Sequence, residues 1–191
     1  MWFIPFSKIC YSKFEVFYSL RGVTTLIDLL ELSRLSSAVG QLLLRRHLKL
    51  VTAESCTGGL LAKAITDIAG CSAWYDCGFV VYSEMSKQNL LNVASSILSS
   101  YGAVSQKTVE AMAKGALVKS QAQYSIAITG IAGPGGASIQ KPVGLVWFAW
   151  LSVSGAMKSQ ACNFEGDRDA IRMQSVYFAL KTMEELLLQP I

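Results

Sequence analysis

The sequence is poor in histidine and in charged residues, and these two deficits exclude different kinds of protein. It has one histidine, His47, among 191 residues, and Asp, Glu, Lys and Arg together make up 16%. A zinc site draws on several His or Cys ligands at short spacings, so no bound metal ion is expected. Because 52% of the residues are apolar, the chain is predicted to fold into an ordered domain. The apolar surplus also predicts a homodimer or higher homo-oligomer.

Features of nucleic-acid-binding and membrane-spanning proteins are missing as well. The net charge is +4, and the basic residues are scattered apart from a short cluster at 45–49. No nucleic-acid partner is therefore expected. The aromatic-rich first 22 residues are interrupted by Lys8, Lys13 and Glu15. This pattern fits neither a membrane span nor an ordinary signal peptide, so no membrane partner is expected.

The cysteines do not have the spacing of a disulfide framework. They are five in number and stand at positions 10, 56, 71, 77 and 162. Free thiols in a reducing cytosol are the simplest interpretation, and they predict a cytoplasmic protein.

Residues 1–22 differ in composition from the remainder of the chain. One interpretation is an extension that docks on the body of the protein or on a partner subunit. The other is that translation starts at Val23 from a non-AUG codon, since no methionine lies between Met1 and Met85. Either interpretation divides the chain into an N-terminal extension, 1–22, and one domain, 23–191.

Hydrophobic periodicity and turn residues predict alternating helices and strands after the extension. Apolar residues at three- and four-residue steps indicate helices, and β-branched and aromatic runs indicate strands. The predicted helices cover residues 25–47, 59–68, 83–91, 94–100, 105–118 and 167–188. The predicted strands cover residues 48–53, 74–82, 124–129, 144–153 and 157–164. Early alternation followed by a hairpin predicts an α/β fold, a three-layer α/β/α sandwich with a mixed β-sheet.

Two glycine-punctuated turns, at 51–59 and 129–136, each follow a predicted strand. A turn between a strand and a helix exposes free backbone N–H groups, which favour a phosphate or a developing oxyanion. Neither turn matches the Walker loop or the dinucleotide fingerprint. The alternative interpretation is a pair of tight turns whose small residues let a helix pack closely on a sheet.

The first turn also contains three adjacent nucleophilic side chains, Ser55, Cys56 and Thr57. Tyr82 is predicted at the end of a strand, and Lys87 about one turn into the following helix. The positive end of the helix dipole favours a neutral amine, so Lys87 is a candidate general base. Serine, tyrosine and lysine could together form a proton-transfer chain without histidine. The alternative is a solvated helix lysine and a core tyrosine.

Seven segments in the same order resemble the CinA C-terminal family. The first is Thr52-Ala53-Glu54-Ser55-Cys56-Thr57-Gly58-Gly59, and the others lie at 65–70, 74–82, 102–105, 129–134, 141–144 and 164–168. The resemblance covers about residues 25–188, and only 1–22 has no counterpart. It departs from the family pattern at residues 84–86 and at Ala137. Among these, the carboxylate of Glu84 could pair with Lys87 and raise the pKa of the amine.

The resemblance implies an enzyme of the amidohydrolase class with the three-layer fold already predicted. It would hydrolyse the carboxamide of nicotinamide mononucleotide to nicotinic acid mononucleotide and ammonia, without a metal or organic cofactor, as a dimer or larger assembly. The nucleophile falls on Ser55, with Tyr82 and Lys87 as its proton-transfer partners. The residues assigned to substrate binding are Glu54, Cys56, Thr57, Gly58, Gly59, Thr129, Gly130, Gly133, Pro134 and Arg168.

Several roles remain open at the level of sequence. Cys56 is a rival nucleophile, because a helix N-terminus would lower the pKa of its thiol. Glu54 could orient Lys87 or bind ribose hydroxyls. Arg168 could bind phosphate, or form a salt bridge with Asp167 or Asp169.

Two other functions compete with amide hydrolysis. One is a non-catalytic nucleotide-binding or regulatory module of the competence-associated CinA type, which would need the loops but not the proton chain. The other is a phosphatase or pyrophosphatase, which the sequence disfavours because the usual acidic metal cluster is missing.

Overall fold

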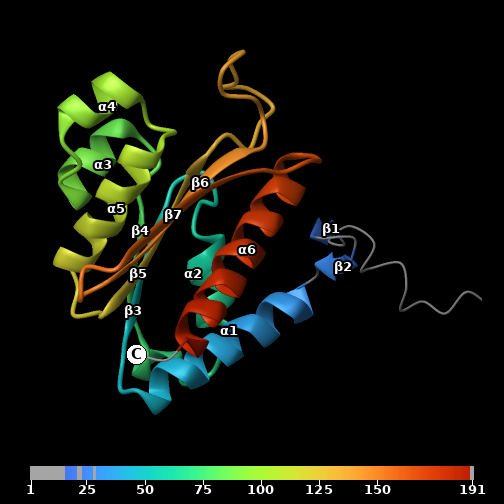
Figure 1. Cartoon of the computed structure of the whole chain (residues 1–191), viewed down its shortest axis with the longest axis vertical. Helices are drawn as coiled ribbons and strands as arrows, with labels where there is room; N and C mark the ends of the chain where they lie inside the picture. The colour runs from blue at the N-terminus through green and yellow to red at the C-terminus, as the bar shows by residue number, and fades with distance from the viewer. Residues whose placement is uncertain (1–15, 21–22, 28, 190–191) are drawn as a thin grey trace, which may run out of the picture.

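A single mixed β-sheet forms the middle of the protein (Figure 1). The computed structural model describes residues 16–20, 23–27 and 29–189. The sheet has the strand order β4-β3-β5-β6-β7, in which β3 runs parallel to β4 and β5, and antiparallel pairing joins β5 to β6 and β6 to β7. Its strands are β3 (Leu50–Glu54), β4 (Tyr75–Val80), β5 (Tyr124–Gly130), β6 (Leu145–Ser152) and β7 (Met157–Asn163).

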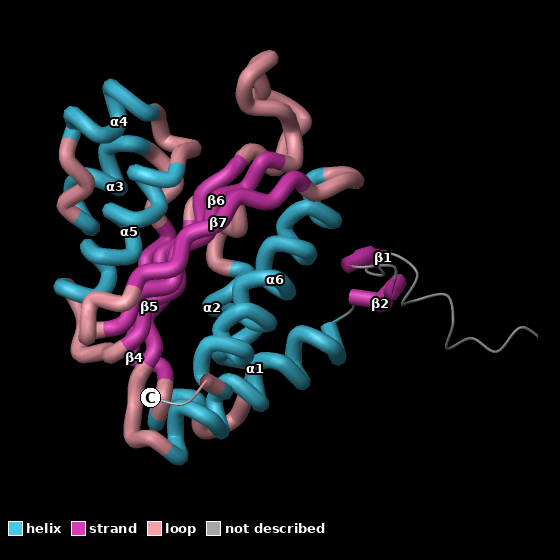
Figure 2. Tube along the Cα trace, viewed as in Figure 1, coloured by secondary structure: helices cyan, strands magenta, loops and turns pink. Residues whose placement is uncertain are grey.

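Helices cover both faces of this sheet, which confirms the predicted three-layer sandwich (Figure 2). One face carries α1 (Leu29–Arg45), α2 (Leu60–Thr66) and α6 (Arg168–Leu188). The other carries α3 (Glu84–Leu91), α4 (Ser95–Tyr101) and α5 (Gln106–Val118). A short 3-10 helix, Cys71–Ala73, precedes β4. No helix in the described part of the chain is long and apolar enough to cross a membrane.

Each face of the sheet has its own hydrophobic core. Leu35, Val39 and Leu43 of α1 are buried in the same cluster as Phe178 and Leu180 of α6. On the opposite face, the buried side chains of α5 form a second cluster with β-strand residues. Apolar residues at three- and four-residue steps therefore mark the inward side of α1, as the periodicity predicts.

The order of the connections brings the two glycine-punctuated turns side by side. The chain leaves β3 through α2 to reach β4 on one side, and returns through α3, α4 and α5 to β5 on the other side of β3. A crevice forms at the carboxyl ends of neighbouring strands whose connections run in opposite directions. Here those strands are β3 and β5, and each leads directly into one of the turns.

The predicted beginning of the first helix is wrong. The prediction placed it at Thr25, whereas α1 begins at Leu29 and Val23–Ile27 forms β2, which pairs antiparallel with β1 (Val16–Leu20). Val, Thr and Ile are β-branched residues that favour a strand, and this preference outweighs the apolar spacing. The boundary proposed at residue 22 therefore falls between two paired strands. The expectations for residues 1–15 lie outside the described residues.

Candidate active site

Ser55 and Lys87 meet in the interior of the protein. Ser55 follows β3 directly, and its backbone N–H donates to the carbonyl of Ile128 on β5 at 3.0 Å. The Lys87 ammonium nitrogen, Nζ, lies 2.9 Å from Ser55 Oγ. Ser55 is 7% exposed and Lys87 1% exposed. A direct hydrogen bond thus links Ser55 and Lys87, the residues that the sequence analysis proposed as nucleophile and base.

The Lys87 amine is held by three oxygen atoms. Besides Ser55 Oγ, its Nζ donates to the backbone carbonyls of Val81 at 2.7 Å and Tyr82 at 3.2 Å. Burial lowers the pKa of Lys87 to about 8, because the protein interior disfavours the charged amine. Cys56 and Glu84 raise this pKa by smaller amounts. The expected effect of Glu84 is therefore present but smaller than that of burial.

Cys56 is a poorer nucleophile than the sequence suggested. Burial raises the pKa of its thiol to about 12, and the negative charge of Glu54 also acts to raise it. The expectation of a lowered pKa is wrong, because α2 begins only at Leu60 and desolvation of the thiolate dominates at Cys56. A neutral, buried thiol reacts slowly.

The Glu54 carboxylate binds backbone N–H groups at the start of α2. Its side chain is fully buried and accepts three backbone hydrogen bonds, from Gly59 at 3.0 Å, Leu61 at 3.0 Å and Ala62 at 2.8 Å. These N–H groups belong to the first turn of α2, where a helix has no internal acceptors. The observed contacts of Glu54 are thus with the start of α2, and its roles in orienting Lys87 or binding ribose stay predictions.

Thr57, Gly58 and Gly59 shape the turn. Gly58 and Gly59 have φ values of 60° and 94°, which side chains of L-residues rarely adopt. The Gly58 N–H donates to the Ser55 carbonyl at 3.1 Å. The Thr57 hydroxyl is buried and finds no hydrogen-bond partner in the described part of the chain.

The second turn contributes mainly backbone groups. The Thr129 hydroxyl donates to the carbonyl of Ala103 at 2.9 Å, which fastens β5 to the segment before α5. A Cβ at Gly130 would lie 2.7 Å from the carbonyl oxygen of Leu145, so only glycine fits there. The Gly133–Pro134 peptide bond is cis. The Gly133 carbonyl accepts a hydrogen bond from Arg168 Nη1 at 2.7 Å.

Tyr82 lies at the surface next to Arg168. It is 63% exposed, and its hydroxyl accepts a hydrogen bond from Arg168 Nη2 at 3.3 Å. The predicted relay through the tyrosine hydroxyl between serine and lysine is not formed. Lys87 donates to Ser55 Oγ directly, and its hydrogen bond with Tyr82 goes to the backbone carbonyl rather than to the hydroxyl. The alternative of a buried core tyrosine is also wrong.

The acidic neighbours of Arg168 have other contacts. Asp167 accepts a hydrogen bond from the Ala170 N–H at 2.9 Å and so caps α6, and Asp169 lies 3.7 Å from Arg172. The salt bridges considered for Arg168 are therefore replaced by contacts with Gly133 and Tyr82.

These residues surround a cavity of about 240 Å³. From the predicted site it includes Ser55, Cys56, Tyr82, Lys87, Thr129, Gly130, Gly133 and Arg168. Ala103, Val104, Ile131, Ala132, Gly135 and Gly136 complete its wall. The lining does not include Glu54, Thr57, Gly58, Gly59 or Pro134. The cavity thus combines a buried serine–lysine pair with one cation, Arg168.

Comparison with known proteins places this site in a family. A sequence model described as CinA C-terminal domain matches residues 32–187. The chain belongs to the CinA C-terminal domain family.

Two relatives of this CinA-family chain carry the same functional name. The chain is 49% identical to "Nicotinamide-nucleotide amidohydrolase PncC" of Escherichia coli strain K12, over 83% of its own length and 96% of that protein. It is 44% identical to the protein of the same name from Pseudomonas putida, over 81% and 96% of the two chains. The names of these relatives agree with the expectation of an amidohydrolase.

A solved structure agrees with the fold of the CinA-family chain. The crystal structure of competence/damage inducible protein CihA from Agrobacterium tumefaciens matches with a TM-score of 0.81 and 41% identity. The match covers 83% of this chain and 96% of the other. Both the predicted family and the predicted fold are confirmed.

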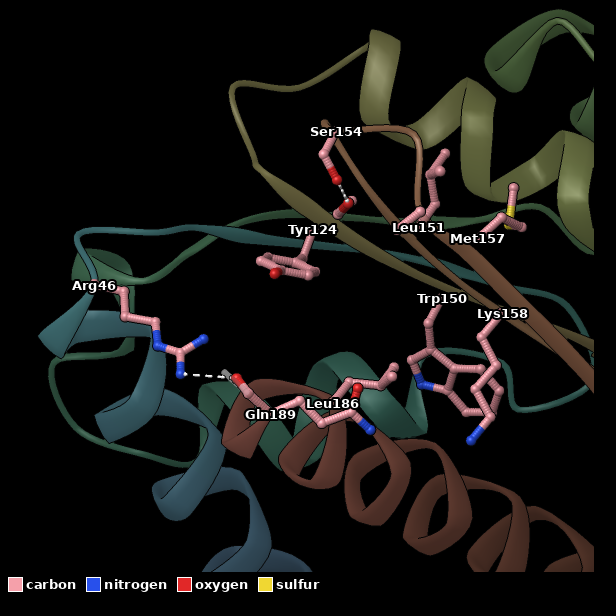
Figure 3. Close-up of a pocket in the computed structure, with 11 residues that line it drawn as sticks. Arg46, Tyr124, Trp150, Leu151, Ser154, Met157, Lys158, Leu186 and Gln189 are labelled. Atoms are coloured by element: carbon pink, nitrogen blue, oxygen red, sulfur yellow. Dashed lines mark hydrogen bonds between the residues drawn. The ribbon is translucent and has the colours of Figure 1, made fainter. Parts of the chain in front are cut away.

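A second, larger cavity of the CinA-family chain lies at the opposite end of β5. Its volume is about 440 Å³, and Tyr124, Trp150, Arg46 and Lys158 are among the residues that line it (Figure 3). Arg46 Nη2 donates to the Gln189 carbonyl at 3.5 Å, and Lys158 Nζ lies 5.7 Å from the centroid of the Trp150 ring. None of its lining residues forms a buried nucleophile–base pair like that of Ser55 and Lys87.

Sequence reasoning missed Arg172 of the CinA-family chain. Its guanidinium donates to the Thr57 carbonyl through Nε at 3.2 Å and Nη2 at 2.7 Å. The available signal was its spacing of four residues from Arg168, which puts both arginines on one side of the last helix.

Among the residues that the structure describes, no group of three or more His, Cys, Asp or Glu side chains could hold a metal ion.

Proposed function

We propose that this chain hydrolyses the carboxamide of nicotinamide mononucleotide, with Ser55 as nucleophile and Lys87 as general base. The observation that carries the proposal is the 2.9 Å contact between Lys87 Nζ and Ser55 Oγ in a buried setting at the wall of a cavity. A lysine with a pKa near 8 is neutral in about a tenth of molecules at pH 7, far more than a lysine with an ordinary pKa. The relatives' shared name supports the choice of substrate.

The first half of the reaction transfers the acyl group to the enzyme. Neutral Lys87 accepts the hydroxyl proton of Ser55, and Oγ attacks the carboxamide carbon. The pyridinium ring withdraws electrons from that carbon and makes it a better electrophile. Lys87 then gives the proton to the amide nitrogen, which leaves as ammonia when the C–N bond breaks.

The second half restores the enzyme. A water molecule gives a proton to Lys87 and attacks the ester carbon. The C–O bond to Ser55 breaks, Lys87 returns the proton to Oγ, and the product forms as a carboxylic acid that releases its proton to solvent and leaves as a carboxylate. One lysine can therefore serve as base and acid in both halves.

Backbone N–H groups are available to stabilise the tetrahedral oxyanion. The N–H groups of Gly58 and Gly59 are engaged by the Ser55 carbonyl and by Glu54. Those of Cys56 and Thr57 donate to no other residue in the described part of the chain. We assign these two N–H groups to the oxyanion, where each donor typically contributes about 3–4 kcal/mol of transition-state stabilisation.

Arg168 is the proposed phosphate partner. It lines the same cavity as Ser55 and is held there by Gly133 and Tyr82. Guanidinium groups bind phosphate strongly, because they offer parallel N–H donors as well as charge. Tyr82 then orients Arg168 and covers the edge of the nucleotide, in place of the proton relay first expected.

A non-catalytic nucleotide-binding module is the competing function. Such a module would gain nothing from burying a lysine amine against a serine hydroxyl, since burial of an ammonium group disfavours folding. The pair therefore favours an enzyme. We further propose that the enzyme works in the cytoplasm as a homodimer or larger assembly. Light scattering of the purified protein would measure the mass of that assembly.

Ammonia release from purified protein tests the proposal. Nicotinamide mononucleotide is the substrate, and nicotinamide riboside and nicotinamide, which lack the phosphate, are the comparison compounds. The expected result is release from the mononucleotide at a much higher kcat/KM than from the other two, and none above background from Ser55→Ala. An inactive wild-type protein that binds the mononucleotide would favour the regulatory module instead.

A further inference from the structure

We propose that Arg172 is a positioning residue that holds the nucleophile turn in its reactive shape. The inference rests on the proposed function, because it takes Ser55 as the reacting group. It concerns a residue outside the cavity, which acts through the backbone of residues 55–58.

Arg172 fixes one peptide group from the side of its carbonyl. The Thr57 oxygen accepts from Arg172 Nε and Nη2, and also from the Leu60 N–H at 3.1 Å. The N–H of the same peptide group, that of Gly58, donates to the Ser55 carbonyl. Because a peptide group is planar and rigid, bonds at both of its ends set its orientation relative to Ser55.

The guanidinium lies directly against this turn. A Cβ at Gly58 would come within 3.3 Å of Arg172 Nη2, so the glycine leaves room for the arginine. Arg172 is absent from the cavity wall, and its Nη1 faces Asp169 Oδ1 at 3.7 Å. Its contacts therefore point to an effect on the turn rather than on bound substrate.

Two buried or half-buried charged groups then hold the turn from different sides. Glu54 accepts a hydrogen bond from the Gly59 N–H at the end of the turn, and Arg172 donates to the Thr57 carbonyl in the middle of the turn. The proposed oxyanion donors, the N–H groups of Cys56 and Thr57, lie between Ser55 and that carbonyl. Rotation of the Thr57–Gly58 peptide would shift the turn that carries both donors.

Replacement of Arg172 by lysine tests the proposal. Lysine keeps the charge but cannot place two fixed donors on one carbonyl. We expect kcat to fall about ten- to hundredfold, because small displacements of catalytic groups lower rates by factors of this size. KM should change by less than about threefold, because substrate contacts are retained. The midpoint of the pH–rate profile should stay where it is, because Lys87 and its surroundings are unchanged.

Hydrogen exchange supplies a readout that does not depend on activity. In wild-type protein the Gly58 amide, which donates to the Ser55 carbonyl, should exchange slowly. In Arg172→Lys and Arg172→Gln, exchange at the Gly58 amide should accelerate at least about tenfold while the sheet stays protected. This result would support the proposal even if nicotinamide mononucleotide proved not to be the substrate.

Two variants serve as controls. Asp169→Asn removes the exposed partner of Arg172, and Arg34→Lys makes the same chemical change at an exposed arginine on α1. Both should keep kcat within about twofold of wild type. Unchanged kcat and unchanged exchange in both Arg172 variants would overturn the proposal. A raised KM with wild-type kcat would overturn it as well, by making Arg172 a substrate ligand.

Discussion

The two cavities at opposite ends of β5 differ in a way that their volumes do not predict. The one at the end of β3 and β5 has about 240 Å³ and contains Ser55 and Lys87, whereas the other has about 440 Å³ and is lined by Arg46, Lys158 and Trp150. Lys87 is almost completely buried, while Lys158 is exposed. Burial of the Lys87 amine lowers its pKa. We therefore expect reactivity to follow the burial of charge rather than the size of a cavity.

The largest expected effect comes from Ser55→Ala. Removal of the hydroxyl deletes the nucleophile, so kcat/KM for ammonia release should fall at least about 1,000-fold. The variant should melt within a few degrees of wild type, because the hydroxyl makes one side-chain hydrogen bond. Activity near the wild-type value would show that Ser55 is not the nucleophile. The smaller cavity would then lose the serine–lysine pair as the feature that distinguishes it from the larger one.

Lys87→Met is expected to reduce kcat/KM about 100- to 10,000-fold, the range typical of a missing general base. Methionine fills the buried space without an amine. In wild type, the acid limb of the pH–rate profile should have its midpoint near pH 8, since the neutral amine is the active form. A profile that is flat from pH 6 to 9 would argue against Lys87 as base.

The same variant gives a stability test. The pKa of Lys87 falls from an ordinary value of 10.5 to about 8 on folding, so the unfolded chain binds more protons between these pH values. Wild-type stability therefore gains a contribution as pH rises from about 8 to 10.5, which Lys87→Met lacks. The difference in unfolding free energy between wild type and variant should shift in favour of wild type over this window, as measured by denaturant titration. A constant difference would contradict a buried, desolvated amine.

A smaller effect is expected from Cys56→Ala. The raised thiol pKa leaves Cys56 protonated, so the variant should keep kcat/KM within about fivefold of wild type. The remaining loss would come from a small gap in the packing of the turn. A loss of kcat/KM as large as that of Ser55→Ala would contradict this prediction and support Cys56 as the nucleophile.

The smallest effect is predicted for the larger cavity. Arg46→Ala and Lys158→Ala remove its two cations and should leave kcat and KM for the mononucleotide within about twofold of wild type, because both charges lie far from Ser55 and Lys87. Steady-state ammonia release measures this directly. A tenfold change in KM would mean that the second cavity takes part in substrate binding.

Local sequence signals predicted most of the framework. Ser83, Ser105 and Asp167 precede α3, α5 and α6, and each accepts a backbone N–H of the helix it precedes. Such capping depends on residues three apart, so it can be read from a short window. The start of α1 could not be read in this way, because the apolar spacing before Leu29 predicts a helix while the β-branched residues there form a strand.

The site itself was predicted only in part. Ser55 and Lys87 were selected from their turn, their helix and the family resemblance, whereas Glu54 and Tyr82 make contacts that the sequence did not predict. Glu54 bonds to N–H groups five to eight residues away, so a capping role could have been considered. Arg172 lies 115 residues from Thr57, and no local pattern connects them.

The sequence by itself determined the alternation of strands and helices, the two turns after β3 and β5, and the choice of reactive residue types. These properties depend on periodicity and backbone geometry over a few residues. Only the tertiary structure decided which of those groups are desolvated. Packing α3 against the end of β3 buries Lys87 beside Ser55 and lowers its pKa, while the same burial raises the pKa of Cys56. Desolvation depends on neighbours from distant parts of the chain, and it acts in opposite directions on amines and thiols because one loses and the other gains charge when it gives up a proton.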